Sequence, residues 1–188
     1  MGNQQFYRIL TTYHGADEAE ERSRLDTIKL LETKPRCFEN DAYEPGHITG
    51  SAFVVDSDLT ETLLTHHGKI KKWLQFGGHS DGHDNPFETA MREAEEESGL
   101  SSLHYFSNSE EIFDMDVHEI PSSSDAPAHN HYDIRVLLAA DRNEPFAVTH
   151  ESDDLRWAPL EKVHHYNSEP AFLRMANKAI ALRQKRTS

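Results

Sequence analysis

The chain has 188 residues, of which 36% are hydrophobic and 28% are charged, and this composition fits a soluble protein with a buried core rather than a disordered or membrane-embedded one. Lys and Arg number 19 against 33 Asp and Glu, a formal net charge of −14, which argues against non-specific binding to nucleic acid or to an anionic membrane. An anionic substrate would therefore need a bridging metal cation.

The N-terminal part of the chain carries no targeting signal that we recognise. The first ten residues lack the apolar run of a signal peptide, Phe6 stands where a myristoylation motif has Ser or Thr, and no apolar run is long enough to cross a bilayer. The single cysteine, Cys37, cannot form a disulfide within the chain, so a reducing compartment is expected. We predict a cytoplasmic protein with no membrane partner.

The first predicted element is a surface helix over residues 16–34. This segment is rich in helix formers, begins with acidic residues and ends before Pro35. The apolar side chains expected to face the protein are Leu25, Ile28 and Leu31. Three short strands rich in β-branched and aromatic residues and separated by turns follow, at residues 47–56, 60–67 and 71–76.

The next predicted helix begins after Asn85 and stops at Gly99. Asn85 is a favourable N-cap, Pro86 suits the first helical position, and Gly99 is a natural left-handed terminator. Both ends of this helix are therefore well specified by local sequence.

This helix gathers an unusual number of glutamates on one side. Glu93, Glu96 and Glu97 share an arc of about 100°, separate from the face with the apolar and small residues. Carboxylates at this spacing repel one another unless a cation lies between them, and Arg92 precedes Glu96 by four residues, a spacing that favours an ion pair. An ordinary solvated acidic face is the alternative interpretation, but oxygen donors in this arrangement are what Mg²⁺ prefers.

Two strands with period-two alternation are predicted at residues 112–120 and 131–140, joined by the turn-rich segment 121–130. A further strand is expected at 154–160. The chain closes with a predicted helix over 168–186, with cations in its last turn. Its face toward the protein is expected to carry Leu173, Ala176 and Ile180.

Alternation along residues 129–133 places His129, His131 and Asp133 on one strand face. They are candidates for a substrate-binding face, as phosphate contacts or as ligands of a second metal ion. The competing interpretation is a polar strand face with chance neighbours, since the chain has 13 histidines.

Residues 78–100 resemble the Nudix box, in which glycine, glutamate, arginine and a cluster of glutamates recur at fixed spacing. The residues in register with that motif are Gly78, Arg92, Glu93, Ala94, Glu96, Glu97, Gly99 and Leu100. Asp84 stands where the family has its first glutamate, a side chain shorter by one methylene. The resemblance implies an α/β fold, a Nudix-type α/β/α sandwich with a mixed β-sheet. We assign a single domain, with a Nudix core over 46–188 and an N-terminal helical extension over 1–45 that carries no resemblance.

The resemblance also implies the chemistry. Nudix hydrolases are pyrophosphatases that use Mg²⁺ or Mn²⁺ to cleave the diphosphate linkage of a nucleoside diphosphate derivative, such as a nucleotide sugar or a nucleoside triphosphate, by attack of water at phosphorus. By carry-over, the metal ligands are Glu93, Glu96, Glu97 and the Gly77 backbone, and Arg92 orients the carboxylates. The general base is either a box glutamate or a later-loop residue, for which Glu151 is our candidate, although a solvated loop carboxylate is the competing interpretation.

Two other functions are consistent with the same fold. A prenyl diphosphate isomerase would need a reactive cysteine, and Cys37 lies outside the region of resemblance. A non-catalytic nucleotide-binding regulator would typically lose box carboxylates, and this chain keeps them. Family members are often homodimers, and residues 1–45 are a candidate interface.

Overall fold

The computed structural model describes residues 2–148 and 152–186, and the chain forms two compact units. Unit 1 consists of residues 1–51, 77–90 and 110–136, and unit 2 of residues 52–76, 91–109 and 137–188. Strands β1, β4 and β7 and helix α3 contribute residues to both units. The assignment of a single domain over 1–188 stays a prediction.

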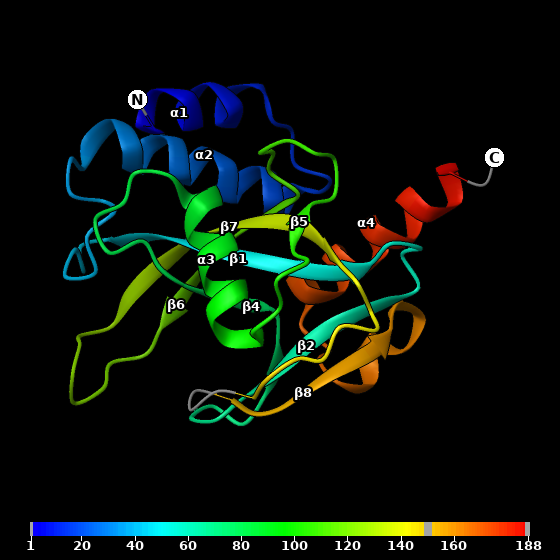
Figure 1. The fold of residues 1–188 in the computed structure, drawn as a ribbon. Coiled ribbons are helices and arrows are strands. Elements are labelled where there is room, and N and C mark those ends of the chain that lie inside the picture. The colour runs from blue at the N-terminus through cyan, green and yellow to red at the C-terminus, as the bar shows by residue number, and fades with distance from the viewer. Residues whose placement is uncertain (1, 149–151, 187–188) are drawn as a thin grey trace. The chain divides into compact units, whose positions relative to one another are not determined.

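Eight strands and four α-helices make up the described part of the chain (Figure 1). The strands are β1 (Gly46–Asp56), β2 (Glu61–His67), β3 (Trp73–Leu74), β4 (Phe76–His79), β5 (His104–Tyr105), β6 (Asp114–Ile120), β7 (His129–Ala140) and β8 (Ser152–Pro159). The helices are α1 (Gly2–Thr12), α2 (Glu18–Thr33), α3 (Pro86–Ser98) and α4 (Pro170–Arg186), with the 3₁₀ helix η1 (Leu160–His165) before α4. Hydrogen bonds order the strands β3-β2-β1-β7-β5, with β4 beside β1, β6 beside β7 and β8 beside β2.

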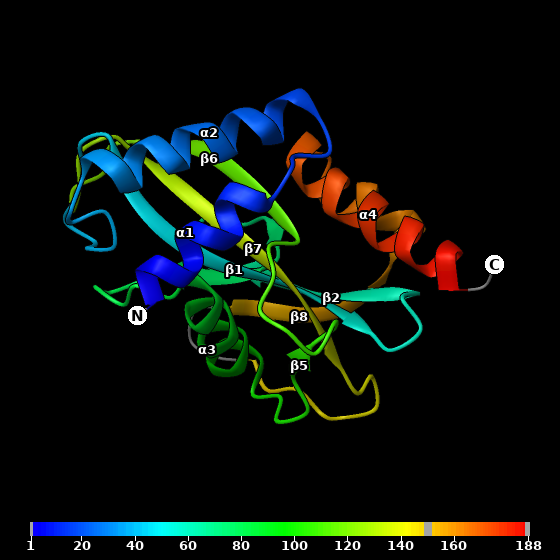
Figure 2. The ribbon, with the colours of Figure 1, turned by 90° about the horizontal axis from the view of Figure 1, so that it is seen from above.

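In unit 1, helix α2 lies along strand β6, with α1 packed beside α2 (Figure 2). The buried face of α2 is partly polar: Glu20 Oε1 accepts a hydrogen bond from the Met115 backbone N–H at 3.2 Å, and Ser23 Oγ accepts one from the Val117 N–H at 3.1 Å. Unpaired N–H groups on a strand edge need acceptors, and these side chains supply them. The helix thus covers the outer edge of β6.

This contact overturns the expected orientation of α2. Leu25 is 53% exposed, and Ile28 and Leu31 are only half-buried, so the predicted apolar face was wrong. Helix α2 turns its hydrogen-bond acceptors, and not its most apolar face, toward the edge of β6. The helix itself is confirmed, and it begins after Asp17, whose side chain accepts from the Glu20 N–H at 2.8 Å.

In unit 2, strand β2 pairs antiparallel with β1, β3 and β8, and its pairing with β8 extends from Glu61 to His67. Helix α4 buries Phe172, Met175, Ala176 and Ala179, and the Phe172 ring lies edge-on to Phe53 at 5.9 Å. The predicted face of α4 was therefore displaced around the helix, because Leu173 and Ile180 are only half-buried.

One predicted strand needed correction, and two elements were not expected. The predicted strand over 71–76 is two elements, β3 and β4, with β4 pairing β1 instead of continuing along β2. Helix α1 and the two-residue strand β5 were not predicted. Within the described residues, no helix is both long and apolar enough to cross a membrane.

Candidate functional site: the carboxylates of α3 and a histidine cluster

Helix α3 is placed by the local signals that its sequence predicted. Asn85 Oδ1 accepts a hydrogen bond from the Phe87 N–H at 3.1 Å, and the Gly99 N–H donates to the Glu95 carbonyl at 2.9 Å. Gly99 has φ +70°, a left-handed conformation that favours glycine. The start and stop of α3 are therefore confirmed.

The predicted carboxylates of α3 are linked through Arg92. Its guanidinium lies 2.8 Å from Glu93 Oε1 and 3.2 Å from Glu96 Oε2. The Glu93 side chain is 13% exposed and that of Glu96 is 62% exposed, while Glu97 as a residue is only 9% exposed. One arginine thus contacts one largely buried and one exposed carboxylate, and the third, buried carboxylate follows Glu96 in sequence.

The donors implied for a metal ion are all oxygen atoms, which suits Mg²⁺ or Mn²⁺. Gly77 stands where a larger residue does not fit, because a Cβ atom there would lie 2.3 Å from Ser51 Oγ and 2.9 Å from the Gly50 carbonyl oxygen. Glycine at this position lets β4 pack closely against β1. The α3 carboxylates thus have the donor chemistry that the resemblance implies for such an ion, and the metal-ligand roles of these residues and of Gly77 stay predictions.

Asp84 belongs to the motif, whereas Glu151 is the candidate from the later loop. Asp84 is exposed in the segment before α3. Glu151, the candidate general base, lies outside the described residues. Its role stays a prediction.

Asp133 lies in a buried ionic network on β7. Its carboxylate accepts hydrogen bonds from Thr49 Oγ1 at 3.1 Å, Ser51 Oγ at 2.6 Å and Arg135 Nε at 2.8 Å. Burial alone would raise the pKa of Asp133, but the charges of Arg135 and His118 and the hydroxyl of Ser51 outweigh it and hold the pKa below its ordinary value. These contacts give Asp133 a structural role in unit 1.

His129 and His131 lie together on β7, their ring centroids 5.2 Å apart. His129 Nδ1 lies 2.7 Å from the Pro127 carbonyl oxygen, which makes this nitrogen the donor. The substrate-binding role expected for both histidines is not tested by these contacts. His131 nevertheless has two histidine neighbours, His47 and His79, that were not predicted from the sequence.

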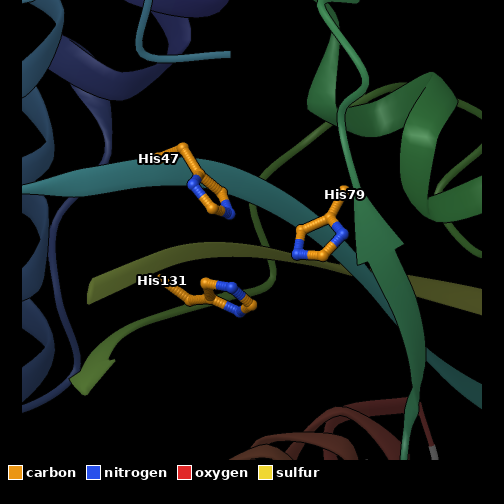
Figure 3. Close-up of side chains that lie close together, drawn as sticks. All are labelled: His47, His79 and His131. Carbon is orange, nitrogen blue, oxygen red and sulfur yellow. The ribbon is translucent and has the colours of Figure 1, made fainter. Parts of the chain in front are cut away.

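His47 on β1, His79 on β4 and His131 on β7 gather into one cluster, with rings that surround a common space (Figure 3). Their ring centroids lie 5.1 Å (47 to 79), 4.8 Å (47 to 131) and 5.2 Å (79 to 131) apart. His47 is 1% exposed, His131 is half-buried and His79 is exposed. The three are separated by tens of residues, so no local pattern signals the cluster.

The cluster favours neutral imidazoles. Burial, reinforced by the neighbouring histidines, lowers the pKa of His47 to about 4 and that of His131 to about 3. The atoms packed around His79 also desolvate its ring and lower its pKa, even though part of the residue is exposed. These rings therefore carry lone pairs rather than positive charge near neutral pH.

Cys37 does not have the environment of a reactive thiol. It is 2% exposed, and burial raises its pKa to about 11. A reactive cysteine is usually an accessible thiolate with a lowered pKa. This argues against the isomerase alternative.

The comparisons with known proteins agree with the motif and the fold. The family model described as NUDIX domain matches residues 47–178. Among solved structures, a NUDIX-family hydrolase from Clostridium perfringens is 28% identical, covering 72% of this chain and 97% of its own, with a TM-score of 0.53. A C. elegans Ap4A hydrolase is 14% identical, covering 73% of this chain and 98% of its own, with a TM-score of 0.59.

A structure described as a UDP-X diphosphatase is 15% identical, covers 97% of this chain and 92% of its own, and has a TM-score of 0.53. Coverage of 97% of this chain means that this match in fold includes most of residues 1–45. The search of curated proteins found no match.

The chain belongs to the Nudix family. Its predicted α/β class with a mixed sheet is confirmed. It is a Nudix hydrolase, an enzyme class that acts on phosphorus anhydrides.

Proposed function

We propose that this enzyme is a divalent-metal-dependent pyrophosphatase that cleaves the diphosphate linkage of a nucleoside diphosphate derivative, either a nucleotide sugar or a nucleoside triphosphate. Water attacks phosphorus in this reaction. The observation that carries the proposal is the Arg92 guanidinium held between Glu93 and Glu96 on α3, beside the largely buried Glu97.

The side chains of α3 have separable roles in this proposal. Glu93, Glu96 and Glu97 supply carboxylate oxygens to Mg²⁺ or Mn²⁺, with the Gly77 backbone carbonyl as a further ligand. When bound, the cation would neutralise phosphate oxygens, align the diphosphate and lower the pKa of the attacking water. Arg92 restricts the rotamers of two carboxylates, so less conformational entropy is lost when they bind the cation.

The remaining proposed residues concern the proton and the substrate. Glu151 is proposed as the general base that takes the proton from water, with a box glutamate as the alternative. His129 and His131 are proposed to contact the substrate phosphates. Asp133, whose carboxylate already accepts three hydrogen bonds, would act by positioning that face of β7.

The test is phosphate release from UDP-sugars, diadenosine tetraphosphate and nucleoside triphosphates, with a coupled phosphatase where the product requires it and with Mg²⁺ or Mn²⁺ added. Wild type is compared with Glu96→Gln and with the matched control Glu95→Gln, since Glu95 is an exposed neighbour on the same helix. We expect metal-dependent turnover of one substrate class, lost in Glu96→Gln and retained in Glu95→Gln. Silence of folded wild type across the panel would favour the non-catalytic, nucleotide-binding role.

We also propose a cytoplasmic enzyme whose partner is a small-molecule nucleotide, with no nucleic-acid or membrane partner, and with a homodimer as the expected assembly. The acidic charge and the single buried cysteine support the first part. Sedimentation equilibrium of the full chain and of a variant lacking residues 1–45 tests the dimer and its proposed interface.

A further inference from the structure

The histidine cluster contains polar atoms that the fold leaves unsatisfied. Among the described residues, neither Nδ1 nor Nε2 of His47 has a hydrogen-bond partner, and neither does Nε2 of His131. The Ala42 carbonyl favours the protonated form of His47 but makes no hydrogen bond of normal geometry with its ring. Buried polar groups in proteins are nearly always paired, so these atoms require a partner.

The three rings also converge geometrically. One ligand nitrogen from each of His47, His79 and His131 lies within 4.8 Å of the others, and the rings come from three different strands (Figure 3). A tetrahedral Zn²⁺ with bonds of about 2.0–2.1 Å needs its ligand nitrogens about 3.4 Å apart. Binding would therefore draw the three ligand nitrogens closer together by side-chain rotation.

We propose that His47, His79 and His131 form a second metal site, which binds one borderline divalent transition-metal ion, with Zn²⁺ as the expected occupant. Imidazole nitrogen suits Zn²⁺ and its neighbours in the first transition row, whereas the carboxylates of α3 suit Mg²⁺ or Mn²⁺. Three protein ligands leave a fourth tetrahedral position for water or an anionic oxygen such as that of a phosphate. This site goes beyond the proposed hydrolysis and uses none of its α3 ligands; it shares only His131 with the residues proposed to contact the substrate phosphates.

A site of this kind would also order its own surroundings. His79 follows Gly77 and Gly78 directly in β4, and His47 and His131 lie on β1 and β7, so one ion would link three strands of unit 1. An ion that binds only the folded chain stabilises it by mass action. Metal binding should therefore raise the melting temperature whether or not the enzyme turns over substrate.

The test is the binding of Co²⁺ and Zn²⁺ alone to the full chain after treatment with a chelator and its removal. Co²⁺ is titrated by visible absorption, Zn²⁺ by competition with a chromophoric chelator, and bound metal is counted by mass spectrometry. We expect one tightly bound ion per chain in wild type, which gives the intense d–d bands of a four-coordinate Co²⁺ site and is distinct from any weaker ion at the oxygen ligands of α3, and a Zn²⁺-dependent rise in melting temperature.

The variants His79→Gln and His131→Asn are expected to lower the affinity at least about 100-fold, because loss of a ligand exceeds the effect typical of an outer-shell partner. His14→Gln, which removes an exposed histidine of the same unit, and Glu96→Gln should bind as wild type does. His79→Gln changes an exposed side chain, so it keeps the test decisive if a more buried variant fails to fold. Equal affinity in wild type and His79→Gln, or no retained ion in folded wild type, would overturn the proposal.

Discussion

The α3 carboxylates and the histidine cluster are two groups of candidate ligands that are held together in different ways. On α3, the carboxylates lie within five residues, and Arg92 forms ion pairs with two of them. In the histidine cluster, three rings come from three strands, and two of them contain buried nitrogens without a partner among the described residues. The first group is organised by one helix and its charges, and the second by strand pairing.

This difference has an energetic consequence. Exposed ion pairs contribute little to stability, so the Arg92–Glu96 pair, whose glutamate side chain is 62% exposed, can change without unfolding the protein. The arrangement of the three histidines depends on the register of β1, β4 and β7. That register depends in turn on buried side chains such as Asp133 and Arg135. The following variants distinguish the contribution of the α3 ion pairs from that of the buried groups that hold the strands in register.

The largest expected loss of stability comes from substituting Arg135. Its side chain is 6% exposed, and its guanidinium contacts the carboxylates of Asp133, Asp114 and Asp116 at 2.8, 3.2 and 3.3 Å. Arg135→Met leaves buried carboxylates without their cation, which costs about 3–5 kcal/mol. We expect the free energy of unfolding in urea to fall by this amount. The matched control Arg156→Met breaks an exposed pair with Asp154 and should cost about 0–1 kcal/mol; similar losses in both variants would contradict the structural role of the network.

A smaller effect is expected from Arg92→Gln, which removes the link between Glu93 and Glu96. We expect kcat to fall about tenfold, a barrier increase of about 1.4 kcal/mol, with little change in the melting temperature. Steady-state kinetics on the substrate found by the panel measures this. Arg92→Lys keeps the charge but loses the two-pronged contact, so full activity in this variant would show that charge alone is sufficient.

Gly99→Ala tests the local encoding of α3. A side chain at φ +70° is strained, and its Cβ would lie 3.3 Å from the Ala147 Cβ. We expect a loss of about 1–2 kcal/mol, measured by urea unfolding. The control is Gly68→Ala, at a turn glycine without a positive φ. An equal loss of unfolding free energy in this variant would contradict the role of Gly99 as the terminator of α3.

The smallest effect concerns Glu144, which accepts hydrogen bonds from the Ser101 N–H and hydroxyl and from the Ser102 N–H, just after α3. The hydroxyl and backbone groups of these serines lower its pKa to about 2. The unfolded chain therefore takes up a proton first as the pH falls. The stabilisation is complete above the ordinary glutamate pKa of about 4.3 and disappears as the pH falls toward 2.

The measurement is the melting temperature of wild type and Glu144→Gln across this pH window. The two should differ more at pH 6 than at pH 2.5. A difference independent of pH would show that the carboxylate charge is not what holds residues 101 and 102.

Much of helix α3 was predictable because its determinants are local. Asn85 and Gly99 act on backbone groups of the same helix, and the helical period alone places Glu93, Glu96 and Glu97 on one arc. The faces of α2 and α4 were not predictable in the same way. Leu25 is exposed because the edge of β6 selected Glu20 and Ser23 as acceptors, and that edge lies almost a hundred residues further along the chain.

The sequence by itself determined the Nudix motif, the α/β class, most helices and strands, and the acidic arc of α3, since these depend on periodicity and on contacts between near neighbours. Only the tertiary structure decided that Asp133 pairs with Arg135, Ser51 and Thr49 and that His47 and His79 join His131. The physical reason is that strand pairing sets which distant side chains meet, and the alternation of a single strand carries no information about its partner's register.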